Sequence, residues 1–381
     1  MKNLKIELHL LQSFPPSCLN RDDTNTPKTC EFGGVSRARV SSQCWKRAIR
    51  DYFQANAPER KGTRSKRLKA ELITALAELG AGDAASLDKP VTAFVTTFYA
   101  GMDKKRPDET NVLVFWSQAE FAKMVEILCD GEVLSGLSQE SPVIAKKSDI
   151  EKQLKNAGQS ADVALFARML ADSPGLNVDA SCQVAHAIST HAVNLELDFF
   201  TAVDDLKNTD ESDDAGAGML GTVGYDSACY YRYTLLDVAQ LTSNLHGTPE
   251  EAFDSVKVYL QAFLEAVPNA KQNSFAHGVL PFFAFAVVRE AGAPSSLVNA
   301  FAKPVSPRRG GDLLSESALA LTKHAARLNE VYDLYDGAKA FYFSALDAET
   351  DLTALPGENV VKSAALVEMT LEAARNFAEA Q

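Results

Sequence analysis

The residues of this sequence best suited to chemistry are the basic ones between positions 31 and 50, and the chemistry they suit is the binding of phosphate groups. Gly33 and Gly34 permit a tight turn, and Ser41 stands where a helix would be capped. From there the helical period places four polar and basic side chains on one face, namely Gln43, Lys46, Arg47 and Arg50. A helix N-terminus also offers free N–H groups and a partial positive charge. The segment therefore predicts a helix that holds successive phosphates.

Positive charge is concentrated around this helix. Residues 28–69 contain twelve Lys and Arg against three Asp and Glu, a balance of +9, whereas the whole chain has a net charge of −12. A protein that is acidic overall but gathers positive charge in one segment is expected to meet a polyanion there. The pattern leaves one alternative open, which is a basic helix face that contacts only solvent.

Nothing in the sequence requires an enzyme. The patterns G-x-S-x-G, G-x-x-x-x-G-K-[ST], G-x-G-x-x-G and H-E-x-x-H are absent, so we expect no catalytic residue. His186 and His191 are five positions apart, but no cysteine or carboxylate pattern completes a metal site with them. The six cysteines form no zinc spacing. We therefore expect neither a metal nor a cofactor.

Length and hydropathy set the class of protein. A chain of 381 residues is long enough for two or three domains. No apolar run reaches the length of a membrane helix, and polar residues interrupt the N-terminal segment that a signal peptide would keep apolar. We expect a cytoplasmic protein with no membrane partner.

The elements that must position the basic helix indicate an α+β fold. Alternating apolar residues at positions 4–10 predict a half-buried strand, and a loop rich in Pro, Asn and Asp follows at residues 13–34. The basic helix comes next, and residues 61–169 have mainly helical patterns, typical of an inserted domain. Residues 279–288 form an apolar run fit for a central strand. This order favours a domain of ferredoxin-like or RRM type.

A projecting hairpin is expected in the second half of the chain. Extended segments at residues 179–203 and 225–236 flank an acidic, Gly-rich stretch. In the second segment Tyr230, Tyr231 and Tyr233 surround Arg232. These tyrosines either stack on RNA bases, as the aromatic residues of RRM strands do, or belong to the core, and the sequence leaves both open.

Several stretches, taken in order, resemble the crRNA-binding backbone subunit (CasC family) of the type I-E CRISPR surveillance complex, Cascade. They are SCLNRDD at residues 17–23, FGG and RARVSSQCWKRAIR within residues 32–50, VAHAISTHAVNLELDFFTAVDDL at 184–206, YYRY at 230–233, VPNAKQ at 267–272 and NAFAKPV at 299–305. The resemblance implies an RRM-like palm of residues 1–60 and 170–381, a helical fingers domain of residues 61–169 and a β-hairpin thumb of residues 190–233.

The resemblance also implies a function and a set of partners. Several copies would stack along the spacer of one CRISPR RNA and present it for pairing with target DNA. The other partners would be the large, small, repeat-endonuclease and 5′-handle-capping subunits. The guide would be gripped by Ser41, Gln43, Lys46 and Arg50, together with Arg21 and Lys28 from the preceding loop. Met169 matches a position that wedges near a displaced nucleotide, and we expect its neighbour Arg168 to contact the guide as well.

Two other functions remain open. Backbone subunits of type III complexes resemble this chain in fold and cut RNA with an Asp of the first loop, where Asp22 and Asp23 stand here. A general single-strand binding protein would use the same basic helix, without a defined guide or partner subunits. The thumb tip and the fingers of this chain differ most from the type I-E proteins that it resembles, so we infer no guide contact in those two regions.

Overall fold

The computed structural model describes residues 3–142, 147–171, 173–202, 219–306 and 311–380. The chain divides into two compact units, each of which is built from separate stretches of sequence. The first unit consists of Met1–Asn3, Arg50–Gln183 and Leu236–Tyr259, and the second of Leu4–Ile49, Val184–Leu235 and Leu260–Gln381. The first unit therefore starts earlier and ends later than the fingers segment of residues 61–169 expected from the sequence, and it includes residues 236–259 as well.

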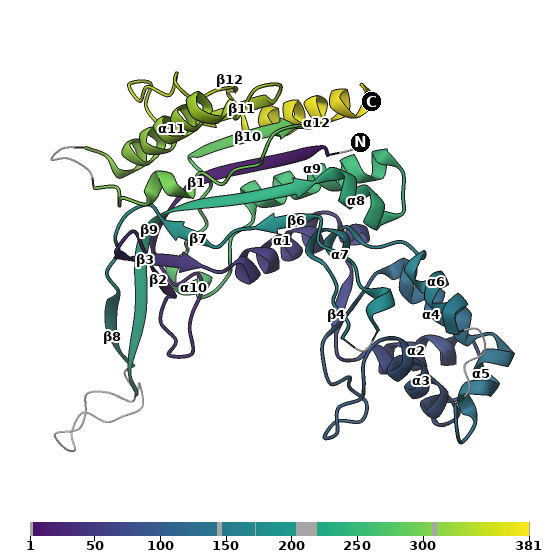
Figure 1. Cartoon of the computed structure of the whole chain (residues 1–381). Coiled ribbons are helices and arrows are strands. Elements are labelled where there is room, and N and C mark those ends of the chain that lie inside the picture. The colour runs from purple at the N-terminus through teal and green to yellow at the C-terminus, as the bar shows by residue number, and fades with distance from the viewer. Residues whose placement is uncertain (1–2, 143–146, 172, 203–218, 307–310, 381) are drawn as a thin grey trace, which may run out of the picture. The chain divides into compact units, whose positions relative to one another are not determined.

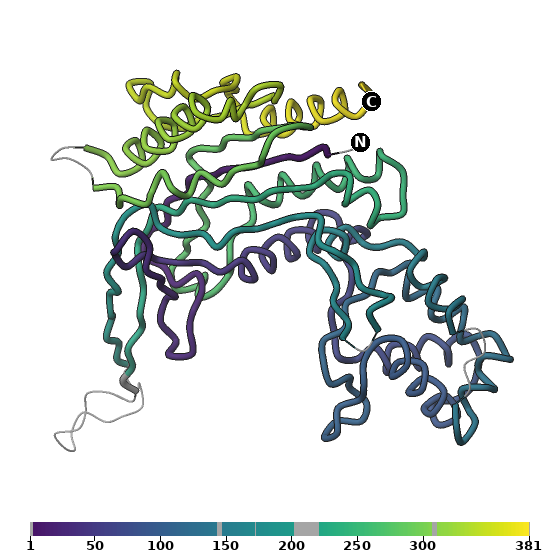
Figure 2. The backbone as a smooth tube through the Cα atoms, viewed as in Figure 1, coloured from purple at the N-terminus to yellow at the C-terminus, as the bar shows by residue number. Residues whose placement is uncertain are grey.

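The second unit is built on a large, mostly antiparallel sheet, which makes the fold α+β. Its strand order is β12-β11-β10-β1-β9-β7-β3-β2 (Figure 1). These strands are β1 (Lys5–Ser17), β2 (Thr29–Phe32), β3 (Val35–Val40), β7 (Ala187–Ser189), β9 (Met219–Asp237), β10 (Phe283–Arg289), β11 (Lys339–Ser344) and β12 (Glu358–Asn359). Figure 2 shows β1 and β10 side by side although they lie far apart in the sequence, and their register runs from Lys5↔Arg289 to Leu11↔Phe283.

Strand β1 is buried on both faces, whereas the alternation of its residues predicted a half-buried strand. Two polar residues on the second face have partners inside the protein, because Glu7 forms an ion pair with Arg289 and His9 shares a hydrogen bond of 2.8 Å with the hydroxyl of Tyr231. The strand also continues through the two prolines at positions 15 and 16, where the sequence predicted a loop. Both prolines are exposed, and the fixed φ of proline fits an extended backbone.

Four helices accompany the strands of the second unit, in whole or in part. They are α1 (Ser42–Asn56), α9 (Pro249–Glu265), α11 (Leu313–Tyr332) and α12 (Ser363–Glu379). Apolar residues of α11, among them Ala318 and Leu321, form one core with Phe283 and Phe285 of β10. The central strand β10 lies within a few residues of the apolar run that predicted it.

A hairpin extends from the same sheet. Strand β8 (Glu196–Ala202) pairs with the first part of β9 in an antiparallel ladder that runs from Glu196↔Tyr225 to Ala202↔Met219. Leu197 and Phe199 on β8 are exposed. Strand β8 lies in the first of the two extended segments expected for the thumb, whereas residues 219–224 of β9 form a strand where the sequence predicted part of the acidic connecting stretch. Residues 203–218 of that stretch lie outside the described residues.

The first unit is mainly helical. Its elements include α2 (Leu68–Glu78), α3 (Ala84–Phe98), α4 (Gln118–Leu128), α5 (Gly131–Ser138), α6 (Lys147–Lys155), α7 (Ala161–Phe166) and α8 (Val238–Leu245), and the paired strands β4 (Thr63–Ser65) and β5 (Val114–Trp116). Buried residues of α2, α3, α4 and α6 form its core. Ser117 caps α4, because its Oγ accepts a hydrogen bond of 2.9 Å from the Glu120 N–H.

Candidate nucleic-acid interface

The start of helix α1 has the structure that its sequence predicted. Trp45, Ile49 and Phe53 are buried on one face, and Gln43 and Arg47 are exposed on the other. Since apolar and polar residues alternate with the helical period, this helix packs on one side and leaves polar groups on the other. The sequence was sufficient to locate both its first turn and its buried face.

Ser41 joins the helix to the loop that precedes β2. Its Oγ accepts from the Cys44 N–H at 3.3 Å, which caps the helix, and its own N–H donates to Asn20 Oδ1 at 2.9 Å. The Cys44 Sγ in turn lies 3.5 Å from the carbonyl oxygen of Leu19. The loop and the helix N-terminus are therefore held together by side-chain and backbone hydrogen bonds.

Basic groups gather beside this capped helix start. The Arg39 guanidinium donates to the Thr29 carbonyl at 3.2 Å and lies 3.1 Å from His186 Nδ1. Burial lowers the pKa of His186, and the positive charges of Arg39 and Lys28 lower it further. The charge of Lys28 also reaches Cys44, whose pKa burial raises to about 11. Lys28, Arg39 and His186 thus form a cluster next to Ser41, which we call the Lys28 cluster.

The sequence missed two members of the Lys28 cluster. Arg39 stood in the basic run but was not assigned a role, and His186 was weighed only as a metal ligand. No group of three or more His, Cys, Asp or Glu residues that could hold a metal ion occurs in the described part of the chain. The pairing of β3 with β7, through Arg39↔Ile188 and Val40↔Ala187, is what places Arg39 beside His186, and one sequence alone does not show that register.

The loop between β1 and β2 is shaped by Asp22. Its carboxylate accepts from the N–H groups of Thr24 at 2.9 Å and Thr26 at 3.1 Å, and also from both threonine hydroxyls. The first and largest cause of its lowered pKa is the Thr24 side chain. Arg21 donates to Asn25 Oδ1 at 2.7 Å within the same loop. Asp22 therefore acts as the structural centre of a turn.

Arg50 does not belong to the exposed face on which the sequence placed it. Its Nε lies 2.8 Å from Asp162 Oδ2, its Nη2 donates to the Gly62 carbonyl at 3.1 Å, and its guanidinium lies 4.6 Å from the centre of the Phe115 ring. Asp162 is fully buried, so its carboxylate requires a nearby cation. The expectation that Arg50 contacts phosphate is wrong, because this ion pair uses the guanidinium in the interior of the first unit.

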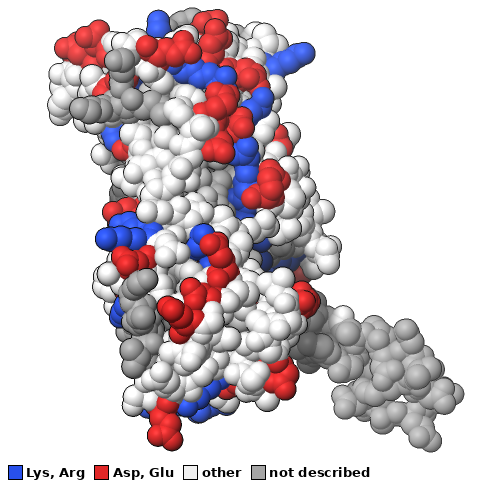
Figure 3. All heavy atoms as spheres, turned by 90° about the vertical axis from the view of Figure 1, so that its right-hand side faces the viewer, with Lys and Arg blue, Asp and Glu red and all other residues white. Residues whose placement is uncertain are grey.

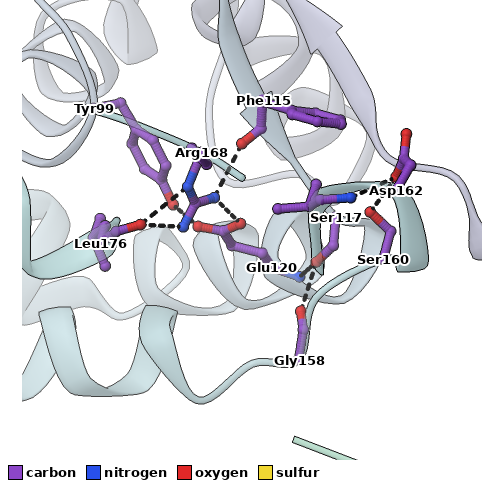
Figure 4. Close-up of polar contacts among 10 residues, drawn as sticks. Tyr99, Phe115, Ser117, Glu120, Gly158, Ser160, Asp162, Arg168 and Leu176 are labelled. Carbon is purple, nitrogen blue, oxygen red and sulfur yellow. Dashed lines mark hydrogen bonds and ion pairs between the residues drawn. The ribbon is translucent and has the colours of Figure 1, made fainter. Parts of the chain in front are cut away.

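Arg168 is also a buried structural residue (Figure 4). It forms an ion pair with Glu120 and donates to the carbonyls of Leu176 at 2.8 Å and Phe115 at 3.0 Å. Glu120 accepts a further hydrogen bond of 2.8 Å from the Tyr99 hydroxyl. The expectation that Arg168 contacts the guide is therefore wrong, whereas the next side chain, Met169, is 86 % exposed.

The tyrosines at positions 230, 231 and 233 belong to the core, and their burial rules out stacking on RNA bases. Arg232 between them lies under the Trp45 ring, 3.6 Å from its centre, and 4.5 Å from that of Phe263. It also donates to Gln12 Oε1 at 2.6 Å and to the Phe263 carbonyl at 2.8 Å. Arg232 thus links α1, α9 and β1 inside the second unit.

Comparison with known proteins gives this fold a family. A family model described as CT1975-like protein, Cas_CT1975, matches residues 6–368. The chain belongs to the CT1975-like family. A solved chain of a "CRISPR RNA-guided surveillance complex, pre-nicking" is 31 % identical, with a TM-score of 0.85, and the match covers 97 % of this chain and all of that one. A chain of a "CRISPR RNA-guided surveillance complex" is 27 % identical, with a TM-score of 0.75, and the match covers 97 % and 99 %. No curated protein sequence matches.

In this CT1975-like protein the second unit holds most of the residues assigned to guide binding. Arg21, Lys28, Ser41, Gln43, Lys46 and Arg47 belong to it, whereas Arg50, Arg168 and Met169 belong to the first unit. Lys46 is half-buried and Arg47 is exposed. The face of the molecule drawn in Figure 3 carries acidic and basic side chains interspersed. Within the described residues no helix is long and apolar enough to cross a membrane.

Proposed function

We propose that this CT1975-like protein is the backbone subunit of a type I-E Cascade complex and binds the spacer of a CRISPR RNA. The observation that carries the proposal is the Lys28 cluster beside the capped N-terminus of α1, in a chain whose whole length matches subunits of RNA-guided surveillance complexes. Arg39, Lys28 and the helix N-terminus, with its partial positive charge, would form a site for the phosphates of a single strand.

Such a grip suits a guide of any sequence. Contacts to phosphates position a nucleic acid but carry no sequence information, and base pairing then reads the target. The buried tyrosines agree with this division, since they offer no surface on which a base could be read. We propose that the chain works without catalysis, that several copies stack along the guide, and that the complex includes the large, small, repeat-endonuclease and 5′-handle-capping subunits and pairs with target DNA.

The strand order supports an RRM-like palm in the second unit. The central strands lie in the order β10-β1-β9-β7, with α1 following β1 in the chain and α9 following β9. This is the order of a split β-α-β-β-α-β unit, in which the first strand lies between the fourth and the third. The β8–β9 hairpin would then serve as the thumb, and the helices of the first unit as the fingers.

The Asp22 turn argues against the type III alternative, in which an Asp of this loop cuts RNA. Asp22 is already committed to hydrogen bonds with Thr24 and Thr26, which leaves the exposed Asp23 as the candidate. In the presence of Mg²⁺, we expect neither the unaltered protein nor Asp23→Ala to cut a guide-complementary RNA. Periodic cleavage that disappears in Asp23→Ala would establish the alternative.

Purification from cells that also express a CRISPR array and the partner subunits tests the proposal directly. We expect the bound nucleic acid to be uniform RNA, each molecule made of one spacer flanked by repeat fragments. Lys46→Ala and Arg39→Ala should each weaken binding equally for all spacers and lower the salt slope by about 0.7 per lost phosphate contact. Random RNA fragments, or a loss confined to one spacer, would contradict the proposal.

A further inference from the structure

A small polar cavity lies in the first unit, behind the buried Arg168. Its volume is about 200 Å³, and its lining includes Lys155, Gln159, Arg168, Asn177, Asn244 and His246. Figure 4 shows two of its wall residues, Arg168 and Leu176, joined by hydrogen bonds. We call this space the Gln159 cavity.

Several polar groups around the Gln159 cavity already have partners. The Arg168 guanidinium is bound to Glu120 and to the Leu176 and Phe115 carbonyls. The Asn244 amide donates to the carbonyls of Ala164 at 2.8 Å and Asp179 at 2.7 Å. Its Oδ1 accepts from Gln240 Nε2 at 2.8 Å. These groups form a fixed polar frame rather than a set of free ligands.

Gln159 is the exception. Its side chain is 92 % buried, since only 8 % of it is exposed, and its Oε1 has no hydrogen-bond partner among the described residues. A buried acceptor without a partner costs about 1–3 kcal/mol. An unpartnered acceptor that lines a cavity is best explained by a ligand that enters the cavity and donates a hydrogen bond to this acceptor.

Unusual backbone conformations surround the cavity. Ala167, next to Arg168, has φ 77° and ψ 158°, a combination found almost only in glycine. His246 also has a positive φ, of 52°. Strain of this kind collects at ligand sites, where the surrounding structure holds it in place.

The chemistry of the cavity selects its ligand. The unpartnered atom is an acceptor, so a phosphate, which also accepts, would leave it unsatisfied. The lining carries two basic residues, Lys155 and Arg168, against one acidic residue, Asp179, and this excess of positive charge disfavours a metal cation. A neutral group with an N–H donor satisfies Gln159 Oε1, and a flat group could also lie against the exposed His246 ring.

We propose that the Gln159 cavity binds the edge of one unstacked RNA base. The inference rests on the proposed function, because it takes the ligand to be part of the bound guide. Each of the four RNA bases carries at least one N–H on its pairing edge. A single acceptor therefore holds any of them, as a subunit that serves every spacer requires.

A series of RNAs, each with one abasic position, tests the proposal on the full-length protein in its complex. The abasic change removes a base and keeps every phosphate. For the unaltered protein we expect some positions of the series to weaken binding about fivefold to tenfold, the worth of about one hydrogen bond. In Gln159→Leu we expect the intact RNA to bind that much more weakly and the same abasic positions to cost nothing further. Without RNA, Gln159→Leu should unfold at a higher temperature, because it removes an unpartnered buried acceptor.

The matched control is Gln153→Leu, the same substitution at an exposed position of α6. It should reproduce the abasic losses of the unaltered protein. If Gln159→Leu shows the same abasic losses as the control, the cavity holds only water and the inference fails, while the proposed function stands. If the unaltered protein binds none of the RNAs, the proposed function and the inference fail together.

Discussion

Arg47 and Arg50 stand one turn apart on helix α1, and the structure predicts opposite consequences for the same substitution at the two positions. Arg50 neutralises the fully buried carboxylate of Asp162. Removing one partner of a buried ion pair costs about 3–5 kcal/mol, because the other charge is left uncompensated. Asp162 keeps its hydrogen bonds from the Gly62 N–H at 2.7 Å and the Ser160 hydroxyl at 2.8 Å. We therefore expect Arg50→Ala to lower the free energy of unfolding by about 3 kcal/mol, the lower end of this range.

The assay is thermal unfolding combined with the salt dependence of RNA binding. About 3 kcal/mol corresponds to a fall in Tm of about 10 °C for a unit of this size. Arg50→Ala should show that fall, while the salt slope of the folded protein stays unchanged. Arg47→Ala should leave Tm within about 2 °C and lower the salt slope by about 0.7, the share of one phosphate contact.

The double variant Arg50→Ala/Asp162→Ala identifies the cause of the loss. Because it removes both charges, it should be more stable than Arg50→Ala alone, and the difference measures the coupling of the pair. An Arg50→Ala protein with an unchanged Tm and a reduced salt slope would refute the assignment of Arg50 to the interior and restore it to the RNA-binding face.

Three further predictions follow from the structure. Gly33→Ala should destabilise the protein by more than 3 kcal/mol in urea unfolding, because its Cβ would lie 1.7 Å from the Ala302 carbonyl oxygen. Gly34 has a similar positive φ but open space around it, so Gly34→Ala should cost only about 1 kcal/mol. Equal losses of stability in the two variants would contradict this prediction. Ala167→Gly should raise the free energy of unfolding by about 1 kcal/mol by relieving its backbone strain, and a loss of stability would show that no strain is present. Burial lowers the pKa of His9 to about 3, so the unfolded chain binds a proton below pH 6.5 that the folded chain does not. The free energy of unfolding should therefore fall by about 1.4 kcal/mol per pH unit between pH 6 and pH 3. The fall should be shallower in His9→Gln, which lacks the titrating ring.

Much of the secondary structure follows from local pattern. The Ser41 cap and the helical period after it were enough to place the start of α1, and the apolar run at residues 279–288 was enough to place β10 at the centre of the sheet. The first prediction holds because burial follows the helical period, and the second holds because every residue of β10 is buried. The turn at Gly33 and Gly34 is equally local, since both residues adopt a positive φ.

The local sequence pattern did not predict which charged side chains are buried and which are exposed. Lys46 and Arg50 share a predicted polar face, and what separates them is Asp162, which is remote in the sequence and meets Arg50 only after folding. The Lys28 cluster depends in the same way on the pairing of β3 with β7. Arg232 and its neighbouring tyrosines had the composition of a base-stacking strand, but Arg232 packs against Trp45 and Phe263, and all three tyrosines are buried.

The hydrogen bond from the Ser41 N–H to Asn20 Oδ1 has a consequence for the kinetics of assembly. It fastens the loop after β1 to the first turn of α1 before any ligand arrives, so little conformational entropy is left to lose when a phosphate binds there. A site that needs no ordering step can capture a strand at a rate set mainly by diffusion and charge. If several copies stack along a guide as we propose, the rate at which each copy joins would then depend on its encounter with the RNA rather than on refolding of the subunit.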